Sequence, residues 1–126
     1  MIDFNGSGFF ARLKKVNNSE FLEMISSFLL NDEEIIGSYK SIRDGVVFTT
    51  KRIIAINVQG ITGKKKDFTS IPYKKITTFS LETAGVFDLD AELEIYMSAV
   101  GKVKFEFTDT TDVKEICKII SMYVLA

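Results

Sequence analysis

The sequence lacks histidine and tryptophan and has one cysteine and one proline among its 126 residues. Histidine is the most common general base and metal ligand, so its absence argues against a catalytic centre or a metal site. Cys117 cannot form a disulfide bond within a single chain, which is typical of a reducing compartment, and we interpret it as a small buried residue. A single proline and the lack of a long polar segment predict a folded chain.

Long hydrophobic runs are also missing. No apolar segment approaches the roughly 20 residues that a membrane-spanning helix needs. The first ten residues, MIDFNGSGFF, contain an acidic residue and no basic segment, so we expect no signal peptide. The sequence therefore predicts one cytoplasmic domain, with peripheral attachment to a membrane as the alternative.

What the sequence does contain is an uneven distribution of charge. Residues 37–76 carry nine lysine or arginine residues and two acidic residues. Residues 1–36 carry three basic and six acidic residues, and residues 77–126 carry four basic and nine acidic residues. The formal net charge of −1 therefore conceals a basic middle segment between two acidic ones. Local charge of this kind determines which surfaces attract anions or one another.

The spacing of apolar residues in the first part of the chain predicts helices. Apolar residues at positions i, i+1, i+4, i+7 and i+8 line one face of a helix, and here they are Phe21, Leu22, Ile25, Phe28 and Leu29. A shorter helical turn before it is indicated by Phe9, Phe10, Leu13 and Val16. We therefore predict that residues 1–31 form an N-terminal helical extension to a domain of residues 32–126.

From residue 34 onward apolar and polar residues alternate, as they do in β-strands. This alternation predicts seven strands, over residues 35–42, 46–49, 52–58, 66–71, 76–83, 89–97 and 103–107. Asp44-Gly45 is suited to a tight hairpin, and Gly60 and Gly63 bracket a second turn. If the apolar residues of the last two strands face one core, their loop has an odd number of unpaired residues. If this loop has three unpaired residues, Glu94 lies opposite Lys104.

The chain ends in a predicted helix that Thr108 or Asp109 caps. Its core-facing stripe consists of Val113, Ile116, Cys117, Ile120 and Val124. Ile119 and Met122 fall off this stripe, and a helix that is apolar on more than one side often packs against another surface. The predicted fold class is α+β, mainly β: a barrel of about seven antiparallel strands, closed by the C-terminal helix and preceded by the helical extension.

Four short motifs follow one another in the basic and acidic segments of the chain. They are FTxKRII at residues 48–54, QGxTGKK at residues 59–65, IPYxxI at residues 71–76 and ETAG at residues 82–85, the last followed by DxEL at residues 90–93. In this order they resemble the bacterial pleckstrin-homology (PH-like) domain family, over roughly residues 32–124. The resemblance implies a PH-like barrel and a role in binding lipid, peptide or further copies of the protein.

The resemblance also implies where a lipid would bind. Eukaryotic PH domains commonly hold phosphoinositides with a basic pattern across their first two strands, where Lys40 and Arg43 fall here. The last arginine of that pattern is replaced by Gly45. Since prokaryotic members look like self-assembling modules, the resemblance implies oligomerisation at least as strongly as lipid binding.

The lysines on either side of residue 70 form the best candidate binding patch, with Tyr73 as an aromatic platform. The candidate anion- or partner-binding residues are Lys40, Arg43, Lys51, Arg52, Lys64, Lys65, Lys66, Tyr73, Lys74 and Lys75. A solubilising surface, an acidic protein surface and an anionic membrane surface remain as alternative explanations of this patch. Nucleic acid is disfavoured, because interleaved exposed aromatic and arginine residues are missing.

The acidic residues of the predicted strand 89–97 form the second candidate surface. Asp90, Glu92 and Glu94 lie about 6–7 Å apart along one face of a strand, which is too dispersed for a metal site. We interpret the candidate oligomer face as Asp90, Glu92, Glu94, Ile119 and Met122. The sequence thus predicts a non-enzymatic interaction module without cofactor, metal or catalytic residues, which acts chiefly by self-association into a homo-oligomer. The alternative function is peripheral binding of anionic lipid or of a phosphorylated ligand.

Overall fold

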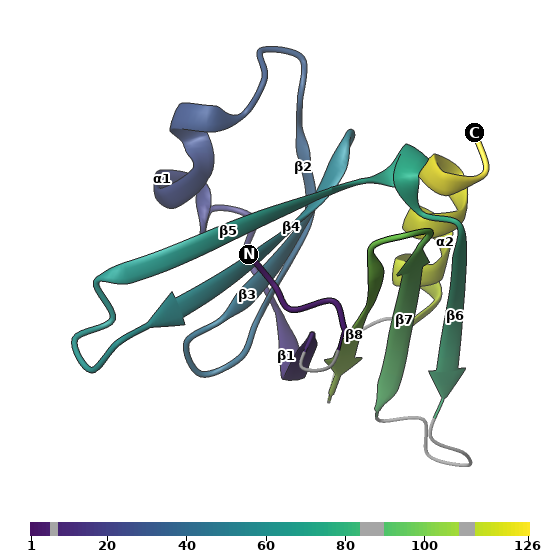
Figure 1. The fold of residues 1–126 in the computed structure, drawn as a ribbon. Coiled ribbons are helices and arrows are strands. Elements are labelled where there is room, and N and C mark those ends of the chain that lie inside the picture. Colours follow the sequence, from purple (N-terminus) through teal and green to yellow (C-terminus); the bar gives the residue numbers. More distant parts are fainter. Residues whose placement is uncertain (6–7, 84–89, 109–112) are drawn as a thin grey trace.

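The computed structural model describes residues 1–5, 8–83, 90–108 and 113–126 (Figure 1). Its elements are β1 (Phe9–Val16), α1 (Leu22–Ile25), the 3-10 helix η1 (Ser26–Phe28), β2 (Ile35–Lys40), β3 (Gly45–Thr49), β4 (Arg52–Gln59), β5 (Lys65–Pro72), the 3-10 helix η2 (Tyr73–Lys75), β6 (Thr78–Thr83), β7 (Ala91–Met97), β8 (Gly101–Phe107) and α2 (Val113–Val124). The predicted C-terminal helix is confirmed, and the helix predicted around residues 21–29 is confirmed as the short pair α1 and η1.

The eight strands form one bent sheet in the order β5-β4-β3-β2-β1-β8-β7-β6. Neighbouring strands are antiparallel, except that β1 runs parallel to β8. The prediction of a closed barrel of seven strands is corrected on two counts. The described part of the chain has eight strands, and its two outer strands, β5 and β6, do not pair with each other. Helix α2 packs against the inner side of the sheet, where Ile116, Ile119 and Ile120 enter the main core (Figure 1).

The helical interpretation of residues 9–16 is wrong, because these residues form strand β1 in the middle of the sheet. The register of β1 against β8 shifts between Phe10 and Leu13, and Arg12 between them has a φ of 57°. A bulge of this kind adds a residue to one strand, so two inward-facing residues lie three positions apart instead of two. The domain boundary at residue 32 stays a prediction, although β1 lies in the same sheet as the strands that follow it.

The first five residues connect distant strands on the inner side of the sheet. The Ile2 amide donates to Thr69 Oγ1 on β5 at 3.1 Å, and the Lys102 amide on β8 donates to the Phe4 carbonyl at 3.0 Å. Ile2 and Phe4 are buried in the main core. This segment therefore links two strands that are not neighbours in the sheet.

A second, smaller core lies on the outer face of β2, β3 and β4, under α1 and η1. Its fully buried members are Phe21, Ile25, Val47, Ile54 and Ile56. The predicted Asp44-Gly45 turn is corrected here, because the turn consists of residues 41–44 and Gly45 begins β3. A Cβ atom at Gly45 would overlap Cζ of the Phe21 ring. Glycine is therefore needed at this position for space.

The other sequence-based turn predictions are confirmed. Gly60 and Gly63 have φ angles of 82° and 69°, and the Gly63 amide donates to the Gly60 carbonyl. Met97 pairs with Gly101, so the β7–β8 loop has the odd number of unpaired residues that the alternation requires, and Glu94 lies opposite Lys104. The two strands therefore present their apolar residues to the same core.

The buried carboxylate of Glu33 ties the segment between η1 and β2 to the sheet. It accepts hydrogen bonds from Arg52 Nε and Nη2, both at 2.8 Å, and from Thr49 Oγ1 at 2.6 Å. The Leu30 amide donates to the same carboxylate at 3.1 Å. Burial raises the pKa of Glu33, but the bonds from Arg52, Thr49 and Leu30 outweigh it and lower the pKa from 4.5 to about 2.

We predict that Gly45→Ala lowers the free energy of unfolding by about 1–3 kcal/mol, because its Cβ overlaps the Phe21 ring. Urea denaturation measures the change. Gly37→Ala is the matched control, since its Cβ would approach only Tyr39 of its own strand, at 3.3 Å. The cost should largely disappear when Phe21→Ala is combined with Gly45→Ala. An equal cost in both backgrounds contradicts the steric explanation.

A second prediction concerns acid stability. Because the pKa of Glu33 is lowered on folding, its contribution is complete above pH 4.5 and is lost as the pH falls toward 2. This contribution amounts to about 3 kcal/mol. Glu33→Gln should therefore lower stability most at neutral pH, and its difference from the wild type should narrow between pH 4.5 and pH 2. Urea denaturation across this range tests it, and a difference that does not change with pH contradicts the prediction.

Candidate functional site

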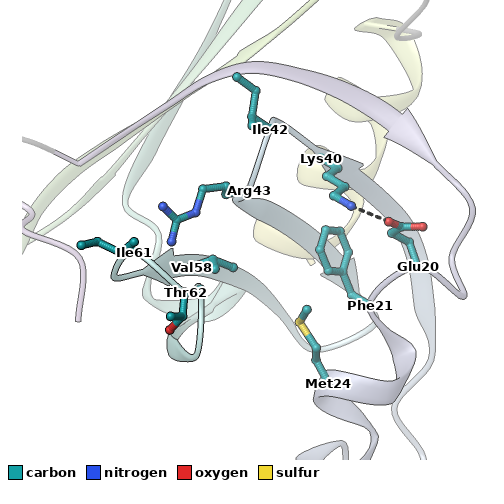
Figure 2. A pocket seen from close by; sticks show the side chains of 10 residues that line it. Glu20, Phe21, Met24, Lys40, Ile42, Arg43, Val58, Ile61 and Thr62 are labelled. Carbon is teal, nitrogen blue, oxygen red and sulfur yellow. Dashed lines mark hydrogen bonds and ion pairs between the residues drawn. The ribbon is translucent and has the colours of Figure 1, made fainter.

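A hollow of about 350 Å³ lies between α1 and the tips of two hairpins, the β2–β3 turn and the β4–β5 turn (Figure 2). It contains two of the predicted binding residues, Lys40 and Arg43. Lys40 Nζ forms an ion pair with Glu20 at 2.7 Å, and Arg43 Nη2 donates to the Gly60 carbonyl at 2.6 Å. Arg43 therefore holds the two turns together, and Glu20 partly neutralises the hollow.

Two exposed isoleucines stand at the rim of this hollow, one on each turn (Figure 2). Ile42 is 93% exposed and Ile61 is fully exposed, at 105% of its reference area. Lys64, Lys65 and Lys66 come three to five residues after Ile61 and are also exposed. The turns therefore present apolar side chains beside positive charge, an arrangement that sequence reasoning did not identify.

A larger hollow, of about 750 Å³, lies on the other side of the β2–β3 turn. It brings Arg12 and Lys14 of β1 close to Lys40 and Arg43, with Asp44 as the acidic residue among its lining residues. Lys14 is the direct cross-strand partner of Lys40. Sequence reasoning missed Arg12 and Lys14, because the interpretation of residues 9–16 as helix separated them from the basic hairpins. The pairing of β1 with β2 is the signal that could have found them.

The lysines predicted to form one patch lie at opposite ends of β5. Lys64, Lys65 and Lys66 belong to the β4–β5 turn and the start of β5, whereas Lys74 and Lys75 belong to η2 after its end. Eight strand residues span roughly 25 Å. The structure therefore divides the predicted patch into two groups. We call Lys64, Lys65 and Lys66 the basic turn.

The remaining predicted basic residues are engaged within the molecule. Lys51 forms an ion pair with Asp32 at 3.1 Å, and Arg52 binds Glu33 as described above. Ser70 Oγ also accepts a hydrogen bond from Arg52 Nη1 at 3.1 Å. These contacts attach the segment between η1 and β2 to the sheet.

Tyr73 is not the exposed platform that the sequence suggested. It is buried, its hydroxyl donates to the Thr49 carbonyl at 2.8 Å, and its ring stacks on Tyr123 of α2 at 5.0 Å. Burial raises the pKa of the Tyr73 hydroxyl, and the nearby Tyr123 and Glu33 add to the rise. Tyr73 thus joins η2 to the C-terminal helix. Cys117, predicted to be buried, is half-buried.

At the other end of the sheet, glutamates face one another across three strands. Glu82 on β6 is the cross-strand partner of Glu92 on β7, and Glu92 is the partner of Glu106 on β8. We call these three residues the acidic row. Lys104 Nζ lies 3.6 Å from Glu92, so the row is partly compensated within the molecule. Like charges directly opposite one another destabilise a sheet.

The other residues of the predicted oligomer face are divided between surface and core. Glu94 lies 3.7 Å from Lys102 and 3.6 Å from Lys104, and Asp90 accepts a hydrogen bond from Thr108 at 2.7 Å. Met122 is exposed, as expected for a contact residue. Ile119 is buried in the main core, so the prediction that it is available to a partner is wrong. The acidic residue Asp88 lies outside the described residues.

The described residues provide charged surfaces and hollows. They include no group of three or more acidic or cysteine side chains placed to hold a metal ion. Within the same residues, no helix has the length and apolar character to cross a membrane. What the structure offers is a basic end and an acidic end of one sheet, and two hollows around the β2–β3 turn.

Comparison with known proteins identifies the family. The family model described as the bacterial PH domain matches residues 5–124. An uncharacterized protein of Bacillus subtilis (strain 168), YjqA, is 40% identical over 116 residues, which cover 90% of this chain and 93% of that protein. The crystal structure of a DUF1696 family protein with a pleckstrin-homology domain from Shewanella loihica PV-4 has a TM-score of 0.80 and 40% identity, covering 90% of this chain and 98% of that one.

A pleckstrin-homology domain from Shewanella amazonensis SB2B is similar as well, with a TM-score of 0.68 and 44% identity over 88% of this chain and 90% of that one. The likeness thus extends over nearly the whole chain, including β1, and confirms the resemblance that the sequence motifs indicated. The chain belongs to the bacterial PH domain family.

Proposed function

We propose that this protein is a non-enzymatic interaction module whose chief partner is a further copy of itself. The observation that carries the proposal is the open sheet, which has the basic turn beside its outer strand β5 at one end and the acidic row, with Glu82 on the outer strand β6, at the other. The contact places the basic turn of one copy on the acidic row of the next. A head-to-tail contact of this kind closes into a ring or continues as a filament.

The acidic row supports this contact because it is incompletely neutralised. Three glutamates oppose one another directly, and Lys104 lies beside one of them. A cationic surface bound over the row relieves the repulsion among the glutamates. The free energy of this relief adds to the attraction between the two copies.

The basic turn supports the contact for the complementary reason. Its three lysines are exposed, and they form no ion pair with an acidic side chain of the residues that the structure describes. The β4–β5 turn and the end of β6 lie on opposite sides of the molecule (Figure 1). One copy therefore does not satisfy both surfaces by itself, and a second copy does.

We predict that light scattering at high micromolar concentration and moderate salt gives a mass well above the monomer mass of 14.2 kDa. The charge reversals Lys64→Glu, Lys65→Glu and Lys66→Glu together should lower this mass, and so should Glu82→Lys combined with Glu92→Lys. Each variant alone carries like charges on both surfaces, whereas an equimolar mixture carries opposite charges at every contact. The mixture should therefore regain the large mass.

The matched control for this prediction is Lys74→Glu with Lys75→Glu, which changes charge at the other end of β5 and should leave the mass unaltered. A monomer in all samples contradicts self-association. A large mass that none of the reversals changes contradicts the electrostatic contact and leaves an apolar one.

The exposed isoleucines favour a second candidate function. In this function the two turns contact an anionic membrane surface, or a phosphorylated ligand at that surface. Ile42 and Ile61 project from adjacent turns beside the basic turn. Apolar side chains that enter the headgroup region add hydrophobic binding energy to the attraction of lysines for acidic lipid. The first function remains our main proposal, because Glu20 and the Gly60 carbonyl already occupy Lys40 and Arg43.

Liposome co-sedimentation tests the second candidate. Vesicles that contain acidic lipid should bind the protein, whereas neutral vesicles should not. Ile42→Ala with Ile61→Ala should weaken binding roughly tenfold through lost apolar burial. Val100→Ala, at an exposed position in the β7–β8 loop, is the control. Equal binding to neutral vesicles, or binding to neither kind, contradicts this function.

A further inference from the structure

Strand β6 has an open hydrogen-bonding edge. It pairs with β7 through all six of its residues without a register shift, and it is the last strand of the sheet. No other strand of the described residues pairs with its outer side, and Figure 1 shows no further strand beside it. In an antiparallel pair, alternate residues direct their N–H and C=O groups away from the partner strand. About half of the β6 backbone groups therefore remain available to a further strand.

The β6 sequence has little of the usual protection against added strands, since Glu82 is its single charged residue. Protected edges carry lysine, proline or a bulge. Residues 78–83 read TFSLET, which contains no lysine and no proline and is rich in residues that favour strands. The opposite edge strand differs: β5 begins with Lys65 and Lys66 and ends at Pro72. The chain thus protects one edge and leaves the other open.

The inner face of β6 shows what kind of side chain an added strand needs there. Phe79 and Leu81 are only half-buried, although their partners on β7, Ile95 and Leu93, are almost completely buried. Phe79 and Leu81 lie on the last strand of the sheet, and part of their surface remains exposed. Apolar side chains on a strand beside β6 would cover it.

The outer face of β6 indicates the opposite requirement. Glu82 lies there beside Glu92, and Ser80 lies beside Glu94. A strand added to this edge has side chains that alternate between the two faces. Its outward-facing residues would lie next to the glutamates, so basic residues at these positions fit best.

We infer that the β6 edge binds an extended segment of another protein, in which apolar and basic residues alternate, as a ninth strand of the sheet. Strand β5 of a second copy fits this edge less well. Three of its four inward-facing residues, Lys65, Asp67 and Thr69, are polar, and Ile71 is the apolar one. The inference goes beyond self-association, since it assigns a peptide partner to a backbone edge.

The test uses a fluorescent seven-residue peptide in which lysine and valine alternate, and the full-length protein. We expect saturable binding by fluorescence anisotropy, with amide shifts in nuclear magnetic resonance spectra centred on residues 78–83. Two further peptides carry N-methyl groups either on all valines or on all lysines. At least one of them should bind about tenfold more weakly, because the methyl groups remove backbone donors without changing the side chains.

Matched variants separate this site from the surfaces of self-association. Glu82→Lys should weaken peptide binding about threefold to tenfold, whereas Glu23→Lys on α1 should leave it unchanged. The triple charge reversal of the basic turn should not weaken peptide binding, even where it abolishes assembly. Peptide binding by a protein that stays monomeric therefore contradicts the proposed function alone.

Several results would overturn the inference. These are the absence of saturable binding, equal affinity for both N-methylated peptides and the unmodified one, and amide shifts that map away from β6. Amide shifts across residues 78–83 that depend on protein concentration without peptide, and that persist in the triple charge reversal of the basic turn, would assign the edge to a second copy and would overturn it too.

Discussion

The two halves of the sheet are joined by β1, and the position of every candidate surface depends on this join. β1 pairs antiparallel with β2 on one side and parallel with β8 on the other. Without it, strands β2–β5 and β6–β8 would form two separate sheets. Because β1 lies between them, the sheet continues from one half to the other, and the basic β5 and the acidic β6 become its two ends. The bulge at Arg12 accommodates the change of partner within a single strand.

Acidic residues of the segment between β1 and β2 determine how much positive charge remains on the surface. Glu20, Asp32 and Glu33 each bind a basic side chain of β2 or of the β3–β4 region. Surface pairs of this kind add little stability, but the buried Glu33 carboxylate also closes a hydrogen-bond network. The surplus of positive charge seen in the sequence is thereby reduced to Arg43 and the lysines at the two ends of β5. Charge counted along the chain overstates the basic surface for this reason.

The sequence predicted the regular strands well, because the alternation in β7 and β8 leaves one register that buries the inward-facing apolar residues of both strands. It failed where local spacing and tertiary structure disagree. The bulge in β1 separates Phe10 and Leu13 by three positions, and this spacing imitates a helix. Tyr73 lies among exposed lysines in the sequence, but its stacking on Tyr123 becomes visible only when η2 meets α2.

The core stripe of α2 includes Ile119 because it follows the i, i+3, i+4 spacing of Ile116, Ile119 and Ile120. The acidic row was only partly anticipated, since Glu82 and Glu106 join Glu92 through cross-strand pairing.

The acidic row and the β6 edge share Glu82, so the two proposed partners act on overlapping residues. A ninth strand with outward-facing basic residues would neutralise Glu82 and Glu92, the residues that attract the basic turn of a neighbouring copy. The attraction between copies therefore falls when the edge is occupied, and by thermodynamic reciprocity assembly lowers the affinity for the segment by the same factor. Binding of an added strand to the β6 backbone and binding of the basic turn to the acidic row are coupled in this way without any change in conformation. The open end of the sheet thus allows one partner to regulate the binding of the other.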